Sequence, residues 1–186
     1  MLTLKEKTAQ IRKELKDQGI TNKMASVRGR YALYDESITI TIKDITVSKN
    51  KVEAIANKYE SIRYDEYNGE VLEGGNTYIH VQFDWQVLEE AKKDFIELAT
   101  EIYNNSQECG KNELYTPYRD DNKVIFYQAH YSNGNPPTIS LSEIKVIKDE
   151  YGEFNSYDRL TSTIATCPEG IASALVQYKF QYGVNI

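Results

Sequence analysis

The first helical pattern follows directly from the N-terminus. Thr3 and Glu6 form the T-x-x-E pattern of a capping box, in which each residue hydrogen-bonds the backbone of the other. Behind Thr3, positions at i, i+4, i+7 and i+11 form one stripe, and Gly19 is a natural helix stop. These features predict a helix over about residues 4–18. The positions in the stripe are Leu4, Thr8, Ile11 and Leu15.

Two further segments repeat their apolar residues at helical spacing. Ser48 can act as N-cap of a helix over about 49–60, and a longer helix is predicted over about 85–104. The apolar faces of these two helices are Val52, Ile55, Ala56 and Tyr59, and Leu88, Ala91, Phe95, Leu98 and Ile102, respectively.

Alternation of apolar and polar residues predicts strands between these helices. Ile38, Ile40 and Ile42 alternate strictly with polar residues, which indicates one buried and one wet face. We therefore expect a hairpin with strands at about 25–34 and 37–43, turning at Asp35-Glu36. Another strand is expected over 78–83 and an earlier one can span 69–72, separated by a turn at Gly74-Gly75-Asn76.

The pattern changes after residue 104. Residues 105–122 show no periodicity and are the best candidate for a linker. A strand is predicted over 124–130, a loop over 133–137, and then a second strand pair or one bulged strand. Thr166 and Glu169 form another capping box, which opens a helix over about 168–181, although the end of this segment fits a strand equally well. The alternating residues in question are Ile139, Leu141, Ile144 and Val146 for the bulged strand, and Tyr178, Phe180 and Tyr182 for the last segment.

This order of elements favours an α+β fold, with helices packed on one face of a mostly antiparallel sheet and two small subdomains. The expected division is an αββαβα domain over 1–104, a linker over 105–122 and a β-rich subdomain over 123–186. With 186 residues and 40% hydrophobic residues, the chain is long enough to bury a core without disulfides or metals. No stretch resembles a signal peptide or a membrane span, so we expect a cytoplasmic protein.

Charge is distributed unevenly along the chain. Residues 1–60 carry 12 basic and 8 acidic residues, whereas residues 61–121 carry 5 and 14. Fifteen tyrosines add rigid rings with polar tips, which suit binding surfaces. Ordinary solvated surface and a biased codon usage would also account for these two features.

Two charged stripes are candidate binding surfaces. An acidic stripe on the predicted 85–104 helix is spaced like a row of phosphates, so it could compete for a basic nucleic-acid groove. A solvated helix face with pairs such as Glu89–Lys93 explains it equally well. A basic stripe with interleaved tyrosines could contact a nucleic-acid backbone, although a charged helix face beside a protected hairpin edge would look the same. The acidic stripe consists of Glu90, Asp94, Glu97 and Glu101, and the basic one of Lys5, Arg12, Lys16, Arg28, Arg30, Tyr31 and Tyr34, with Lys23 nearby.

Residues for catalysis or metal binding do not form any familiar pattern. His80 and His130 lie in predicted strands without ligands at metal spacing, and Cys109 and Cys167 have no marked partner. No phosphate-binding loop, calcium loop or serine elbow is present in the sequence. We therefore expect no catalytic residues, no metal and no cofactor.

Residues 9–84 resemble a large polyvalent protein-associated domain, a small domain of proteins from phages and conjugative plasmids. The resemblance rests on the IRKELK helix, the SVRGRY strand, the SITITI strand, the VEAIANKYE helix and the Gly-Gly hinge before YIHVQF. The family has a glycine-serine turn where this sequence has Asp35-Glu36. No catalytic residue is carried over, and residues 105–186 resemble no family.

The resemblance implies a mobile-element protein that acts against host defence. The leading hypothesis is a free-standing anti-CRISPR or anti-restriction inhibitor that binds a host defence nuclease, such as a CRISPR effector, and blocks nucleic-acid binding or cleavage. The alternative is a nucleic-acid-binding accessory module of a mobile element without inhibitory activity.

Overall fold

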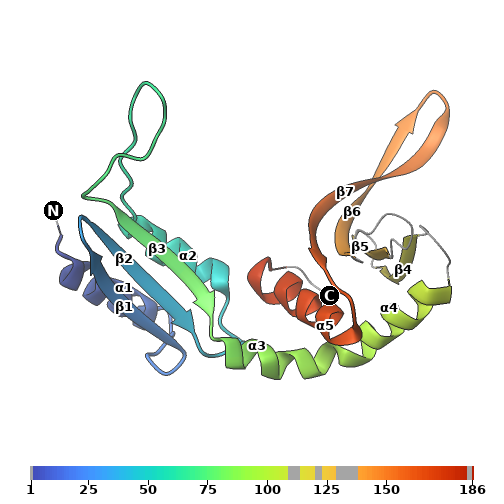
Figure 1. Ribbon diagram of the computed structural model, residues 1–186, viewed down its shortest axis with the longest axis horizontal. Helices are drawn as coiled ribbons and strands as arrows, with labels where there is room; N and C mark the ends of the chain where they lie inside the picture. The colour runs from blue at the N-terminus through green and yellow to red at the C-terminus, as the bar shows by residue number, and fades with distance from the viewer. Residues whose placement is uncertain (1, 109–113, 120–122, 129–137, 184–185) are drawn as a thin grey trace. The chain divides into compact units, whose positions relative to one another are not determined.

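The computed structural model describes residues 2–108, 114–119, 123–128, 138–183 and 186. The chain forms two compact units, which we call unit 1 (Met1–Leu88) and unit 2 (Glu89–Ile186). Each unit combines helices with a sheet of its own, which confirms the α+β class (Figure 1).

Unit 1 is built on a three-stranded sheet in the order β1-β2-β3. Strands β1 and β2 pair antiparallel, whereas β3 runs parallel to β2, so the sheet is mixed. The elements of unit 1 are α1 (Leu4–Asp17), β1 (Ala25–Ala32), β2 (Asp35–Ile42), α2 (Lys49–Ala56), the 3-10 turn η1 (Asn57–Tyr59) and β3 (Thr77–Phe83).

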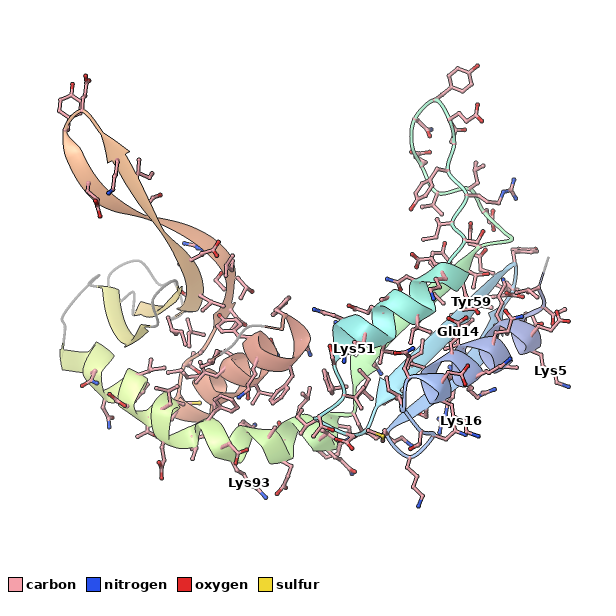
Figure 2. The ribbon with its side chains drawn as sticks, turned by 180° about the vertical axis from the view of Figure 1, so that it is seen from behind. Lys5, Glu14, Lys16, Lys51, Tyr59 and Lys93 are labelled. Carbon is pink, nitrogen blue, oxygen red and sulfur yellow. The ribbon has the colours of Figure 1, made fainter. Side chains whose placement is uncertain are left out.

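Both helices of unit 1 cover the same face of this sheet. In Figure 1 both α1 and α2 lie behind the sheet, and in the opposite view of Figure 2 both lie in front of it. The buried face of β2 consists of Ile38, Ile40 and Ile42, each with no exposed area. Facing them are the predicted helix stripes, since Leu4, Ile11, Leu15 and Val52 are all buried. The alternating apolar residues of the strand and the apolar stripes of the helices are buried in the same layer, and this burial stabilises unit 1.

The capping box of α1 is formed as predicted. The Glu6 backbone N–H donates to the Thr3 hydroxyl, and the Thr3 backbone N–H donates to the Glu6 carboxylate at 2.7 Å. Ser48 is the N-cap of α2, but its side chain makes no capping hydrogen bond.

The hairpin turn lies two residues earlier than predicted. Leu33 and Tyr34 form it, with Leu33 at a positive φ of 40°, and Asp35 and Glu36 belong to β2. Both carboxylates serve other contacts: Asp35 accepts the Asn76 backbone N–H at 2.9 Å, and Glu36 pairs with Lys7 at 2.9 Å. The polar pair therefore marks tertiary contacts of the first residues of β2 rather than a turn.

The connection before β3 contains the predicted turn but no additional strand. Gly74 and Gly75 have positive φ values, as a tight turn requires. Instead of a strand over 69–72, the structure has one isolated bridge between Tyr64 and Val71.

Unit 2 contains a four-stranded antiparallel sheet in the order β4-β5-β6-β7. The strands are β4 (Leu114–Arg119), β5 (Lys123–Gln128), β6 (Thr138–Asp149) and β7 (Gly152–Ile164). A register shift between Leu141 and Ser142 confirms a bulge in the predicted alternating segment. Strands β4 and β7 were not predicted, and His130 and the 133–137 loop lie outside the described residues.

The helices of unit 2 form the rest of its core. The predicted 85–104 helix is longer and is interrupted: α3 (Trp85–Lys92), the 3-10 turn η2 (Lys93–Phe95) and α4 (Ile96–Glu108) follow one another. Helix α4 packs against α5 (Pro168–Val176), which continues as a π-helical turn over Gln177–Gln181. Within this turn, the buried Tyr178 hydroxyl donates to the backbone oxygen of Ile139 in β6 at 2.9 Å.

Two predictions for this half of the chain are wrong. Residues 105–108 are helical and 114–119 form β4, so 105–122 is no simple linker, and the units divide after Leu88 because α4 packs on α5 and β4. The last helix and its π-helical turn cover the predicted range, 168–181, but the N-cap is Cys167 rather than Thr166 and makes no side-chain capping hydrogen bond, so the predicted capping box is not formed. Among the described residues, no helix has the length and apolar character needed to cross a membrane.

Candidate binding surfaces

The acidic stripe lies on the exposed side of the α3–η2–α4 segment. Glu90, Asp94, Glu97 and Glu101, which we call the acidic face, are all exposed. On the opposite side of the segment, Ala91, Phe95, Ala99 and Ile102 are buried. The helical period places the carboxylates away from the core, so that substituting them leaves the packing intact.

Ion pairs neutralise only one end of the acidic face. Glu90 pairs with Lys93 at 2.7 Å, and the neighbouring Glu89 pairs with Lys92 at 2.8 Å. Both pairs have i,i+3 spacing instead of the expected Glu89–Lys93 pair, as suits the 3-10 turn that begins at Lys93. Within the described part of the chain, no cation pairs with Asp94, Glu97 or Glu101. Among the described residues, no ion pair therefore offsets the charge of these three carboxylates.

The seven residues of the basic stripe do not form one surface. Lys5 and Lys16 project from one flank of α1 and are exposed (Figure 2). Arg12 reaches from α1 to the outer edge of β1, where its Nη2 donates to the backbone oxygen of Val27 at 2.6 Å. The guanidinium thus satisfies an edge carbonyl, which protects an unpaired strand edge.

Arg28 and Arg30 lie on the other face of the sheet. The intervening Gly29 faces α1 so closely that an added Cβ would come within 2.9 Å of Leu4 and Thr8. Since neighbouring strand residues point to opposite faces, both arginines point away from α1. Tyr31 follows Gly29 by two residues in β1, so it lies on the same side of the sheet as the helices. Tyr34 is in the hairpin turn.

The face of the unit 1 sheet opposite the helices holds polar residues that sequence reasoning did not select. Tyr78 and His80 of β3 share it with the two arginines, because β3 aligns its alternate residues with those of β2. His80 is exposed. The alternating threonines of β2 signalled a wet face, but only the pairing register shows which residues of β1 and β3 lie beside them.

A groove between α1 and α2 is the third feature. Its volume is about 400 Å³, and Ile55 and Ala54 line its apolar part. Beside it, the Tyr59 hydroxyl donates to the Glu14 carboxylate (Figure 2). Lys58 also pairs with Glu14, at 3.0 Å. The hydrogen bond from Tyr59 is the main cause that lowers the pKa of Glu14, and the contact with Lys58 adds to it. The Tyr59–Glu14 hydrogen bond also raises the pKa of Tyr59 to about 12. The remaining lining residues are Glu14, Asp17, Gln18, Lys51 and Lys58.

The described residues contain no grouping of three or more histidine, cysteine or acidic side chains that could hold a metal ion. Cys167 is an exposed free thiol, and Cys109 lies outside the described residues.

The chain was also compared with known proteins. No family model matches it, no curated protein does, and no solved structure does.

Proposed function

We propose that the protein is an anti-defence inhibitor of a mobile genetic element, and that its acidic face binds the nucleic-acid surface of a host defence nuclease such as a CRISPR effector. The observation that carries this proposal is the row of Asp94, Glu97 and Glu101, three exposed carboxylates without a pairing cation among the described residues. The mobile-element context is part of the proposal and comes from the sequence resemblance of residues 9–84 alone.

Electrostatics and rigidity support this mode of binding. A nuclease guides nucleic acid through a basic channel, and such a channel attracts a row of carboxylates just as it attracts phosphates. The carboxylates project from a helix whose opposite side is buried, so their backbone is already ordered before binding. Inhibition would be stoichiometric and would need no catalysis and no cofactor.

Charge reversal tests the proposal. Asp94→Lys, Glu97→Lys and Glu101→Lys are combined, and cleavage of target DNA by purified CRISPR effector nucleases is measured at increasing inhibitor ratios. We expect the unchanged protein to inhibit near a one-to-one ratio and the triple variant to lose inhibition. Glu90 is reversed in a fourth step, where a smaller effect is expected because Lys93 already neutralises it.

A matched control separates the acidic face from net charge. Glu66→Lys, Glu73→Lys and Glu150→Lys change three other exposed carboxylates by the same total charge and should leave inhibition intact. A second control replaces Lys5 and Lys16 with Glu, and circular dichroism confirms that each variant is folded. Inhibition that survives the acidic-face variant, or an unchanged protein that inhibits no effector, would contradict the proposal.

A further inference from the structure

The face of the unit 1 sheet opposite the helices presents nine residues in three rows, which we call the open face. The pairing register aligns each residue of β2 with one of β1 and one of β3. The rows are Arg30, Ser37 and Tyr78; Arg28, Thr39 and His80; and Ser26, Thr41 and Gln82.

Burial agrees with an uncovered surface. Within unit 1, α1 and α2 pack on the other face, and no described element packs on this one. Arg28, Arg30 and His80 are exposed, and Ser37 and Thr39 in the middle strand are half-exposed. By contrast, the alternate β2 residues that face the helices are fully buried.

The open face is positively charged. It contains two arginines and no carboxylate, and neither arginine forms an ion pair among the described residues. Carboxylates lie only at its borders: Asp35, the β2 residue before Ser37 on the same face, accepts the Asn76 N–H, Asp84 the Gln86 N–H, and Glu60 the Ile79 N–H at the outer edge of β3. A polyanion would therefore meet cations and hydroxyls at the centre of the open face and carboxylates only at its borders.

The order of side chains across the strands suits a nucleotide. Each of the first two rows runs from a guanidinium through a hydroxyl to a ring, over about 10 Å, because neighbouring strands lie about 4.8 Å apart. The two arginines are separated by about 6.8 Å along β1, since each residue advances the strand by about 3.4 Å. Phosphate, sugar and base follow one another in the same order in a nucleotide, and the row repeat provides for two successive nucleotides.

We propose that the open face binds single-stranded nucleic acid, with Arg28 and Arg30 contacting phosphates and Tyr78 and His80 stacking on bases. Stacking requires bases whose faces are accessible, as they are in a single strand and not within a duplex. A protein partner fits less well, because the centre of a protein interface is apolar and this array is almost entirely polar. The inference rests on unit 1 alone and does not depend on the acidic face of unit 2.

Fluorescence anisotropy with labelled oligonucleotides tests this inference. The probes are a twelve-nucleotide oligo-dT, the corresponding oligo-rU and a twelve-base-pair duplex, each titrated with the full chain and no nuclease. We expect at least one single strand to bind more tightly than the duplex, and the preferred strand identifies DNA or RNA. Equal or tighter binding of the duplex, or no binding of either single strand, would overturn the proposal.

Two sets of variants assign the contacts. Arg28→Gln with Arg30→Gln should weaken binding and reduce the slope of log affinity against log salt by about 1.4, the value for two single-strand phosphate contacts. Tyr78→Ala should weaken binding by about 5- to 150-fold, whereas Tyr78→Phe, which keeps the ring, should bind like the original.

The matched control removes the same charge from the helix side. Lys5→Gln with Lys16→Gln lowers the net charge of the protein equally but leaves the open face unchanged. We expect its affinity to stay within about twofold of the original, and circular dichroism verifies the fold of every variant. If this control weakened binding as much as the arginine variant, or if Tyr78→Ala had no effect, the open face would not be the binding site.

Discussion

Unit 1 contains 13 basic and 13 acidic residues, whereas unit 2 contains 9 and 15, so that the whole net charge of −6 comes from unit 2. The two units also bury apolar residues differently. In unit 1, a strictly alternating strand and amphipathic helices share one buried layer. In unit 2, much of the core is the almost wholly apolar helix α5, in which Ile171, Ala172 and Leu175 have no exposed area.

This difference shows how one chain can carry two electrostatic surfaces. A neutral unit becomes locally cationic where two arginines lie on a face whose carboxylates are only at its borders, as on the open face. A unit with excess acid presents an anionic surface when part of its carboxylate row lacks cations, as the acidic face does. Net charge alone would have missed the first surface, since the cations of unit 1 are balanced on its other sides.

The largest expected effect tests whether each core belongs to its own unit. Ile40→Ala removes a fully buried side chain from β2, and Leu175→Ala removes one from α5. Each should lower the free energy of unfolding of its unit by about 2–5 kcal/mol. Hydrogen exchange measured by mass spectrometry should locate the faster exchange in β1–β3 for the first variant and in α4 and α5 for the second. Equal acceleration in both units would show that they unfold together.

A smaller effect is expected where α1 approaches the sheet. The added methyl of Gly29→Ala would lie 2.9 Å from Leu4 and Thr8, so α1 would have to shift. We expect a loss of about 1–3 kcal/mol, measured by urea denaturation. The neighbouring Arg28 lies on the open face, so Arg28→Ala should change the free energy of unfolding by less than about 0.5 kcal/mol. A neutral Gly29→Ala would contradict the close packing of α1 on β1.

The smallest effect concerns the pair beside the groove. Tyr59→Phe removes the hydroxyl that lowers the pKa of Glu14, and should cost less than about 1 kcal/mol at pH 7, because solvent screens this partly exposed pair. A lowered carboxyl pKa stabilises the fold above the ordinary value of 4.5, and this stabilisation is lost as the pH falls through the lowered pKa.

The pH dependence of the free energy of unfolding tests this prediction. Urea denaturation of the original and of Tyr59→Phe should give curves that converge at low pH, where Glu14 is protonated. They should also converge in alkali, since the pKa of Tyr59, raised to about 12, makes its contribution disappear between pH 10 and pH 12. A difference that stays constant from pH 3 to pH 7 would contradict the charged hydrogen bond.

Sequence patterns predicted unit 1 well because each of its elements has one face in the core. The alternation of Ile38, Ile40 and Ile42 and the Thr3–Glu6 capping box are local signals, and both elements formed where expected. The turn was misplaced because the polar side chains of Asp35 and Glu36 bind residues far away in the sequence, Asn76 and Lys7, rather than forming a turn.

Unit 2 was predicted less completely, because its strands carry weaker signals. Strand β7 includes exposed Leu160 and Ile164 and a run of small hydroxylated residues, so no alternation distinguishes its faces. The acidic face followed from helical spacing alone. The open face did not, because its composition depends on the register of three strands, of which β1 and β3 are far apart in sequence.

The parallel pairing of β3 with β2 has a kinetic consequence. Strands β1 and β2 are joined by the two-residue turn Leu33-Tyr34, and such hairpins close in about 1–10 μs. Strand β3 can dock only after residues 43–76 have closed a long loop, whose entropy is lost before any pairing is gained. The unpaired edge of β2 is therefore exposed early in folding, and it is the edge at which a newly synthesised chain is most open to pairing with a neighbour.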